Sequence, residues 1–128
     1  YVVRRIQAGL NDRELPVRGR NVLLCGLAYK ADTSDARETP TRAIVAGLLS
    51  LGAQVLVCDP HVPADQFPEG ADRVVCGPEA LPDLAARVDA AVMVVPHSDF
   101  DFEALAAATP WLLDCTSAVP AAPNVERI

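Results

Sequence analysis

Short apolar runs alternate along this chain with segments of helical spacing, and this alternation constrains the fold more than any other feature. Residues 21–25 form an almost continuous apolar run that ends at Gly26, and a second run follows at residues 55–58. A segment with an apolar stripe at helical spacing lies between them. Strands buried on both faces have such runs, and a helix between two of them predicts a right-handed βαβ unit. The two strands are therefore expected to be parallel neighbours.

The helix between these runs carries signals at both ends. Thr39 can cap the first turn with its hydroxyl, and Pro40 suits the first helical position, where no backbone N–H is needed. Gly52 lies just past the expected end, where a left-handed residue commonly stops a helix. The residues of the apolar stripe are Ile44, Val45, Leu48 and Leu49. We therefore predict a helix from residue 40 to about residue 51 that packs on the two strands.

The rest of the chain continues the alternation. Val88 to Val95 is the longest apolar run and predicts a central strand, and residues 111–115 predict a last one. Weaker signals predict a short strand at Val74-Val75, a helix from Pro78 to Arg87, a helix through Ala108 capped by Ser98 or Asp101, and a loose tail from Ala118 onward. The predicted fold class is α/β, with a Rossmann-like open parallel sheet flanked by helices.

Residues 1–17 are expected to form the end of a helix that is already under way at Tyr1, followed by a linker. The apolar stripe of this helix consists of Val2, Ile6 and Leu10. Such a one-sided pattern needs a packing partner. Residues 13–20 contain a proline and a glycine and predict a linker into the domain proper, which spans residues 18–128. Because the chain begins at Tyr1, without Met and inside a helical pattern, we expect it to be a piece of a longer protein.

Composition and charge exclude several classes of protein. The 128 residues are 51% hydrophobic and 22% charged, which indicates one globular domain and excludes the disordered and fibrous classes. The net charge of −6 argues against nucleic acid or an anionic membrane as the main partner. The charge is uneven, since residues 1–42 carry eight of the 11 basic side chains and only five of the 17 acidic ones.

The cysteines predict a structural role and a reducing compartment. Cys25, Cys58, Cys76 and Cys115 form no Cys-x-x-Cys pair, and the two histidines complete no zinc-finger spacing, so no metal site is expected. Three of the four lie in or at the end of apolar runs, where a thiol packs as a small hydrophobic group. Free thiols, the lack of a signal peptide and the lack of an apolar run of ~20 residues predict a cytoplasmic location without a membrane partner.

The loop after the first strand is the expected site, because ligands of open α/β sheets bind beyond the carboxyl ends of the strands. Gly26 is the only glycine of this loop, so the loop matches neither the dinucleotide fingerprint nor a Walker loop. It offers Tyr29 beside Lys30, the only lysine of the chain. An ammonium suits a phosphate and an aromatic face can stack on a base. The helix that begins at Thr39 adds a favourable potential for an anion.

The other polar residues near this edge have open alternatives. Lys30 can also be a solvated side chain, and Asp35 and Arg37 can form a local pair that orders the entry to the next helix. Asp59 ends the second strand, where dinucleotide-binding folds place a ribose-binding carboxylate. Without the glycine loop, a role for Asp59 as a cap or turn residue is favoured. His97 follows the longest strand and is expected in a surface loop.

The segment from Gly26 to Pro40 is specific enough to suggest a family. It has the sequence Gly-Leu-Ala-Tyr-Lys-Ala-Asp-Thr-Ser-Asp-Ala-Arg-Glu-Thr-Pro, and further matching segments lie at residues 41–51, 52–55, 58–63, 88–92 and 113–114. These residues resemble the C-terminal domain of the UDP-glucose/GDP-mannose dehydrogenase family, which includes UDP-N-acetylmannosamine dehydrogenases. Residues 1–11 resemble the end of the long helix that joins the two halves of these enzymes. The resemblance covers nearly the whole chain.

The resemblance implies an activity and a division of labour. Family members oxidise the C6 alcohol of a nucleotide-sugar to a carboxylate in two NAD-dependent steps, through a thiohemiacetal and a thioester on a catalytic Cys. The N-terminal domain holds NAD and the middle segment carries that Cys, so this fragment is expected to have no catalytic residue, no cofactor and no activity alone. The implied partners are a UDP-sugar, the protein's own N-terminal NAD domain and further copies in a homo-oligomer, and the implied process is polysaccharide biosynthesis.

The resemblance also assigns residues to the substrate. Tyr29 and Lys30 match the aromatic-Lys pair that lies against the nucleotide-sugar, and Asp35 and Arg37 match an Asp-x-Arg pair that shapes the loop. Many members carry a ligand-contacting Arg shortly after the Asp of the last strand, and Thr116 stands at that position here. The expected substrate-binding residues are Tyr29, Lys30, Arg37 and Thr116.

A non-catalytic Rossmann-like interaction or assembly module is the alternative function. In that case the stripe of Val2, Ile6 and Leu10 and the sheet edges would mediate assembly. A lone NAD-binding domain is disfavoured by the missing glycines. A phosphoacceptor receiver domain is disfavoured because Gly26 and Leu27 stand where an acidic pair is needed.

Overall fold

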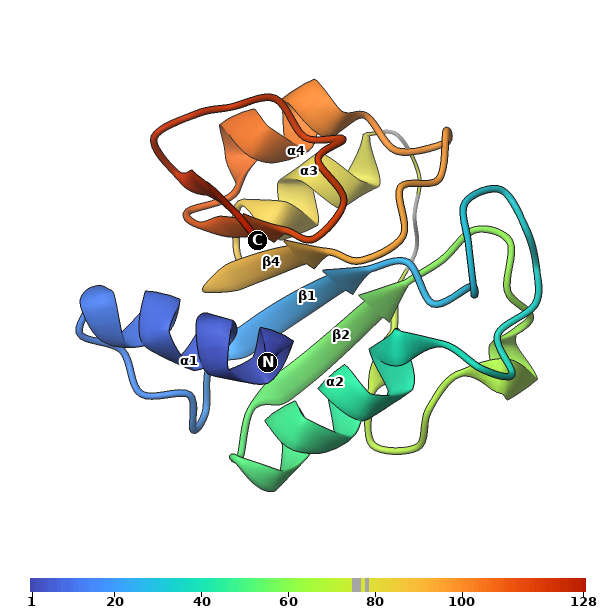
Figure 1. Cartoon of the computed structure of the whole chain (residues 1–128), viewed down its shortest axis with the longest axis horizontal. Helices are drawn as coiled ribbons and strands as arrows, with labels where there is room; N and C mark the ends of the chain where they lie inside the picture. Colours follow the sequence, from blue (N-terminus) through green and yellow to red (C-terminus); the bar gives the residue numbers. More distant parts are fainter. Residues whose placement is uncertain (75–76, 78) are drawn as a thin grey trace.

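A six-stranded parallel sheet forms the middle of the fold, with the strand order β3-β2-β1-β4-β5-β6. The computed structural model describes residues 1–74, 77 and 79–128. Helices α1 and α2 cover one face of the sheet, and α3 and α4 cover the other (Figure 1). The elements are α1 (Val2–Asp12), β1 (Asn21–Cys25), α2 (Pro40–Ser50), β2 (Gln54–Cys58), the 3₁₀ helix η1 (Ala64–Gln66), β3 (Asp72–Arg73), α3 (Ala80–Ala85), β4 (Ala90–Met93), α4 (Phe102–Ala108), β5 (Leu112–Asp114) and β6 (Val125–Arg127). The predicted Rossmann-like α/β class is confirmed.

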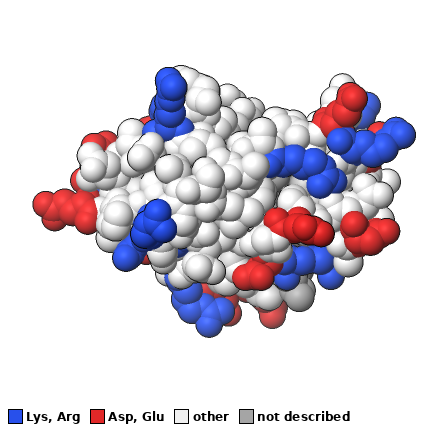
Figure 2. All heavy atoms as spheres, turned by 90° about the horizontal axis from the view of Figure 1, so that it is seen from below, with Lys and Arg blue, Asp and Glu red and all other residues white. Residues whose placement is uncertain are grey.

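Charged side chains of both signs are mixed on the surface. Figure 2 shows the molecule from below, with a largely uncharged centre and with basic and acidic groups interleaved at the end where the loops after β1 and β2 lie. The first third of the sequence has an excess of basic residues, but on this face the basic side chains do not gather apart from the acidic ones. Within the described residues, no helix is both long and apolar enough to span a bilayer.

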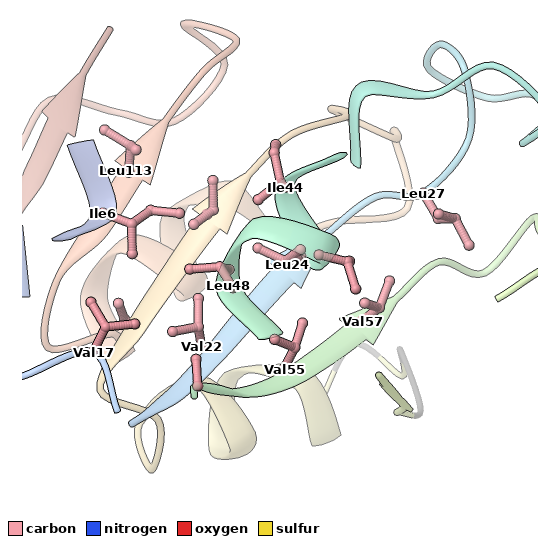
Figure 3. Close-up of a cluster of buried hydrophobic side chains, with 14 of the residues drawn as sticks. Ile6, Val17, Val22, Leu24, Leu27, Ile44, Leu48, Val55, Val57 and Leu113 are labelled. Atoms are coloured by element: carbon pink, nitrogen blue, oxygen red, sulfur yellow. The ribbon is translucent and has the colours of Figure 1, made fainter. Parts of the chain in front are cut away.

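The strands alternate their side chains between two hydrophobic cores, one on each face of the sheet. In β1, Val22 and Leu24 belong to the core under α1 and α2, whereas Leu23 and Cys25 belong to the core under α3 and α4. All four side chains are fully buried. Figure 3 shows the first core, where Leu48 of α2 lies among residues of β1 and β2. A strand buried on both faces needs no polar alternation, which explains the continuous apolar run.

Helix α2 begins and ends as the sequence predicts. The Thr39 hydroxyl accepts a hydrogen bond from the Thr41 amide at 3.3 Å, and Pro40 is the first helical residue. Gly52 follows the helix with φ of +87°, in the left-handed region that favours glycine. Strands β1 and β2 then pair in parallel, with Asn21 opposite Gln54, so the predicted βαβ unit is confirmed.

Helix α1 packs on the sheet of its own chain. Ile6 and Leu10 are fully buried, so most of the stripe considered for assembly is used inside the fold. Gly9 lies against the indole of Trp111, and a Cβ built on it would be 2.3 Å from the ring. Arg5 donates to the Glu126 carboxylate at 2.7 Å and ties α1 to β6. The division into residues 1–17 and 18–128 stays a prediction.

The tail from Ala118 is ordered, so the prediction of a loose tail is wrong. Val125–Arg127 form β6, which pairs in parallel with β5 at the edge of the sheet. The Asn124 amide donates to the Ala106 and Thr109 carbonyls at 2.7 and 2.8 Å and holds the start of this strand. These partners lie 15 and 18 residues away, which is why local sequence gave no signal.

The other boundaries differ from the predictions by a few residues. The run from Val88 to Val95 gives a strand only at Ala90–Met93. The short strand β3 lies just before Val74, and α3 is shorter than predicted. The remaining predictions in this region fall on Val75, Cys76 and Pro78, which lie outside the described residues.

Candidate functional site

The loop after β1 lies at the place where this topology reverses. From β1 the chain moves to β2 and β3 on one side and then returns to β4 on the other side. The carboxyl ends of β1 and β4 therefore form a topological switch point, where open α/β sheets bind ligands. Residues 26–38 follow β1 at this edge, and residues 94–101 follow β4.

Tyr29, Asp35, Arg37 and Glu38 line an open hollow of about 400 Å³ beside this loop. Tyr29 is 60% exposed, an unusual state for a large aromatic side chain. Lys30, next to it, is also exposed, and its carbonyl accepts a hydrogen bond from the Thr33 hydroxyl at 3.0 Å. The structure therefore brings Tyr29 and Arg37 to one hollow, with Lys30 beside it in the chain.

Arg37 and Asp35 form a two-pronged ion pair at the rim of this hollow. The guanidinium donates from Nε to one carboxylate oxygen at 3.1 Å and from a terminal nitrogen to the other at 3.0 Å. The Arg37 side chain, followed by its backbone N–H, lowers the pKa of Asp35 to about 2, and Asp35 in turn raises the pKa of Arg37. The predicted local pair is confirmed, and its geometry fixes the direction of the guanidinium.

Hydrogen bonds connect the start of α2 to the same loop. The Thr41 hydroxyl donates to the Gly26 carbonyl at 2.9 Å, and Arg42 donates to the Ala36 carbonyl at 2.9 Å. The positive end of the helix dipole thus lies close to the loop, as predicted.

Thr116 lies apart from this loop. It follows β5, which is separated from β1 by β4, so the two strand ends are about 10 Å apart. Its hydroxyl donates to the Asp114 carboxylate at 2.7 Å. The structure thus places Thr116 at the same edge of the sheet but engages it locally, in a turn after β5.

Asp59 lies beneath the loop and accepts hydrogen bonds from several backbone amides. One carboxylate oxygen accepts from the Leu27 and Ala28 amides at 2.7 and 2.8 Å, and the other accepts from the His61 amide at 2.8 Å. The predicted turn role is confirmed. Burial raises the pKa of Asp59, but the His97 ring and these amides outweigh burial and lower the pKa to about 2. Asp59 is therefore a buried anion at neutral pH.

This arrangement explains why the turn does not suit a dinucleotide. In dinucleotide-binding folds, the amides after the first strand hold a pyrophosphate. Here the Leu27 and Ala28 amides already hold the carboxylate of Asp59. Gly26 is explained by packing, because a Cβ there would lie 2.5 Å from the Cβ of Val95. The residues present in this turn do not fit NAD.

His97 is fully buried, so the prediction of a surface role is wrong. Its Nε2 lies 2.8 Å from the Asp59 carboxylate, and its Nδ1 accepts from the Asp32 amide at 2.9 Å. The ring packs against His61 and Phe100, with centroid distances of 4.6 and 5.6 Å. Sequence reasoning missed this pair because the partners lie 38 residues apart. One indication was present in the sequence: Asp59 and His97 both follow predicted strands, and parallel strands end at the same edge of the sheet.

Asp32, His61 and His97 come close enough to be considered as metal ligands, with one ligand atom of each within 4.8 Å of the others. Both nitrogens of His97 are already hydrogen-bonded. The His61 ring contacts the Asp99 carboxylate at 2.6 Å. As arranged, these groups form a hydrogen-bonded network that connects the loops after β1, β2 and β4.

Comparison with known proteins identifies the family. The model of the UDP binding domain of the UDP-glucose/GDP-mannose dehydrogenase family matches residues 23–121. The chain belongs to this family. It is the C-terminal, UDP-binding domain of the UDP-glucose/GDP-mannose dehydrogenase family, as the resemblance of the loop predicted.

Relatives in this dehydrogenase family are longer than the chain. The UDP-glucose 6-dehydrogenase of Rhizobium meliloti (strain 1021) is 32% identical over 106 residues, which cover 77% of this chain and 23% of the relative. The UDP-N-acetyl-D-glucosamine 6-dehydrogenase of Pseudomonas aeruginosa is 33% identical over 100 residues, which cover 78% and 23%. The crystal structure of an NDP-N-acetyl-D-galactosaminuronic acid dehydrogenase from Methanosarcina mazei Go1 has a TM-score of 0.70 at 26% identity and covers 88% of this chain and 24% of that one. The chain thus spans about a quarter of the length of these relatives.

Proposed function

We propose that this chain is the substrate-binding domain of an NAD-dependent dehydrogenase that oxidises the C6 alcohol of a UDP-sugar to a carboxylate. The observation that carries the proposal is the hollow of about 400 Å³ beside the loop after β1, in a chain of the UDP-binding family. Tyr29 offers an exposed ring for stacking, while Lys30 and Arg37 offer two positive groups for a diphosphate. Thr116 is proposed to contact the ligand from the loop after β5, two strands away from β1 at the same edge of the sheet.

NAD and the catalytic Cys are proposed to lie in other parts of a longer protein. The turn after β1 is closed to a pyrophosphate by Asp59, so the chain itself would leave the cofactor to a separate N-terminal domain. The role of this chain is then to bind and orient the nucleotide end of the substrate, which places the sugar at the reacting centre. The chain alone is expected to have no dehydrogenase activity.

A titration followed by NMR tests the binding role and separates it from assembly. UDP-glucose is added to the ¹⁵N-labelled full-length protein that carries this chain, and the amide signals of the chain are followed. We expect the signals of residues 27–38 to shift, while those of α1 and of the amino-terminal ends of the strands stay in place. If the assembly module were the correct function, the signals of the whole chain would remain unmoved.

A further inference from the structure

The backbone on both sides of Lys30 is fastened to one buried pair, Asp59 and His97. Before Lys30, the amides of Leu27 and Ala28 donate to one oxygen of Asp59. After Lys30, the amide of Asp32 donates to Nδ1 of His97 at 2.9 Å. Because His97 contacts that same oxygen of Asp59 at 2.8 Å, one continuous set of hydrogen bonds holds both flanks of the exposed lysine.

The contacts of His97 define its protonation state. The Asp32 amide can only donate, so Nδ1 must carry a lone pair. Asp59 is ionised and can only accept, so Nε2 must carry the proton. His97 is therefore a neutral imidazole in the Nε2–H tautomer. Protonation at Nδ1 would set two donors against each other at the Asp32 contact. The charged groups that face the ring are Asp59, the Asp32 carboxylate at 3.9 Å and, where it is protonated, His61.

The loop conformation needs these anchors. Asp32 has φ of +59°, in the left-handed region that is unfavourable for residues other than glycine. Its carboxylate accepts from the Ser98 amide at 2.8 Å and from the Ser98 hydroxyl at 3.0 Å. Two residues of the segment after β4 therefore hydrogen-bond to Asp32: His97 accepts from its amide, and Ser98 donates to its carboxylate. Tyr29 is fixed as well, since its amide donates to the Asp35 carbonyl at 2.6 Å.

We propose that His97 is a positioning residue for the loop after β1, residues 26–38. Its neutral imidazole contacts Asp59 through Nε2 and accepts a hydrogen bond from the Asp32 amide at Nδ1. These contacts fix the backbone on both sides of Lys30. The role of His97 is indirect, because it is fully buried while Lys30 is exposed. The proposal depends on the proposed function in one respect, namely that the ligand of Lys30 is a UDP-sugar. The ordering of the loop itself is independent of that function.

Two variants separate the two contacts of the ring. His97→Asn can place its side-chain oxygen near the position of Nδ1 and keep an acceptor for Asp32, while it loses the contact with Asp59. His97→Gln can place its amide N–H near the position of Nε2 and keep the contact with Asp59, while it leaves the Asp32 amide without its acceptor. Ser98→Ala is the matched control, since it removes only the hydroxyl contact to Asp32.

The experiment measures amide hydrogen exchange of residues 29–33 and the affinity for UDP-glucose in the full-length protein that carries this chain. The free energy of unfolding of each variant is measured alongside. We expect exchange about tenfold faster and affinity about tenfold lower in His97→Gln, since the loss of one hydrogen bond commonly has an effect of this size. We expect His97→Asn to stay within about threefold of wild type in both, even where its free energy of unfolding falls.

The outcomes distinguish positioning from a purely structural role. If His97→Gln is folded and leaves both exchange and affinity at wild-type values, the proposal is overturned. It is also overturned if exchange and affinity in the two variants follow only their free energy of unfolding, without rescue by Asn. If the wild type binds neither UDP-glucose nor UDP, the part that all UDP-sugars share, the proposed function fails, and the exchange of residues 29–33 still decides the role of His97.

Discussion

The carboxylate of Asp59 lies 2.8 Å from Nε2 of His97, and neither side chain has any exposed surface. A buried anion is stable only where hydrogen bonds replace the water that it loses. Asp59 receives them from His97 and from backbone amides of the loops after β1 and β2. Its charge therefore connects three loops of the site.

Acid should destabilise the chain through Asp59. The pKa of this carboxyl is lowered from 3.8 to about 2 in the folded state, so between those values the unfolded chain binds more protons than the folded one. The stabilisation is fully present above about pH 4 and is lost as the pH falls towards 2. We expect a loss of about 2 kcal/mol from this group, measured by urea denaturation at a series of pH values.

Asp59→Asn is the control for the acid effect. This variant should lower the free energy of unfolding by about 2–4 kcal/mol at pH 7, because it weakens the hydrogen bonds that the charged carboxylate accepts and turns one acceptor into a donor that faces other donors. Its slope between pH 4 and pH 2 should be shallower than that of the wild type. Equal slopes would show that other carboxyl groups, such as Asp35, cause the acid sensitivity.

Gly9→Ala should destabilise the fold although alanine favours helices. The new Cβ would lie 2.3 Å from the ring of Trp111, so helix or indole must shift. Overpacking of this kind costs about 1–3 kcal/mol, which exceeds the gain of about 1 kcal/mol from helix propensity. Gln7→Ala, at an exposed position of the same helix, should change the free energy of unfolding by less than about 0.5 kcal/mol. A more stable Gly9→Ala variant would argue that α1 does not pack as described.

Cys115 should react slowly with alkylating reagents. Burial, and secondly the charge of Asp114, raise the pKa of this thiol to about 11, and only the thiolate is nucleophilic. At pH 8 we expect iodoacetamide to modify Cys115 at least about a hundredfold more slowly in the folded chain than in urea. Peptide mapping by mass spectrometry resolves this cysteine from the others. Labelling at the rate of the unfolded chain would contradict the structural role predicted for it.

Much of the fold could be predicted because its signals are local. The apolar run of β1 and the cap and proline of α2 depend on residues within a few positions of one another. The ion pair of Asp35 and Arg37 is local as well, since only Ala36 separates its partners. Such features follow from spacing and residue type alone.

The features that could not be predicted depend on distant partners. Strand β6 forms because it pairs with β5 at the edge of the sheet and because Asn124 donates hydrogen bonds to the carbonyls of Ala106 and Thr109. The burial of His97 depends on Asp59 and Asp32, which reach it only when β1, β2 and β4 are assembled. The loop motif predicted the family. It did not predict that the amides of the turn after β1 hold the carboxylate of Asp59 in place of a ligand anion.

The most direct test of the account is the affinity of the Lys30→Ala variant for UDP-glucose, measured by calorimetry in the full-length protein that carries this chain. Arg87→Ala is the matched control, because it removes one positive charge from an exposed position just before β4, at the opposite edge of the sheet. We predict that Lys30→Ala weakens binding at least about tenfold, or about 1.4 kcal/mol, and that Arg87→Ala stays within about twofold of wild type. Wild-type affinity in a folded Lys30→Ala protein would contradict the assignment of this loop to the nucleotide-sugar.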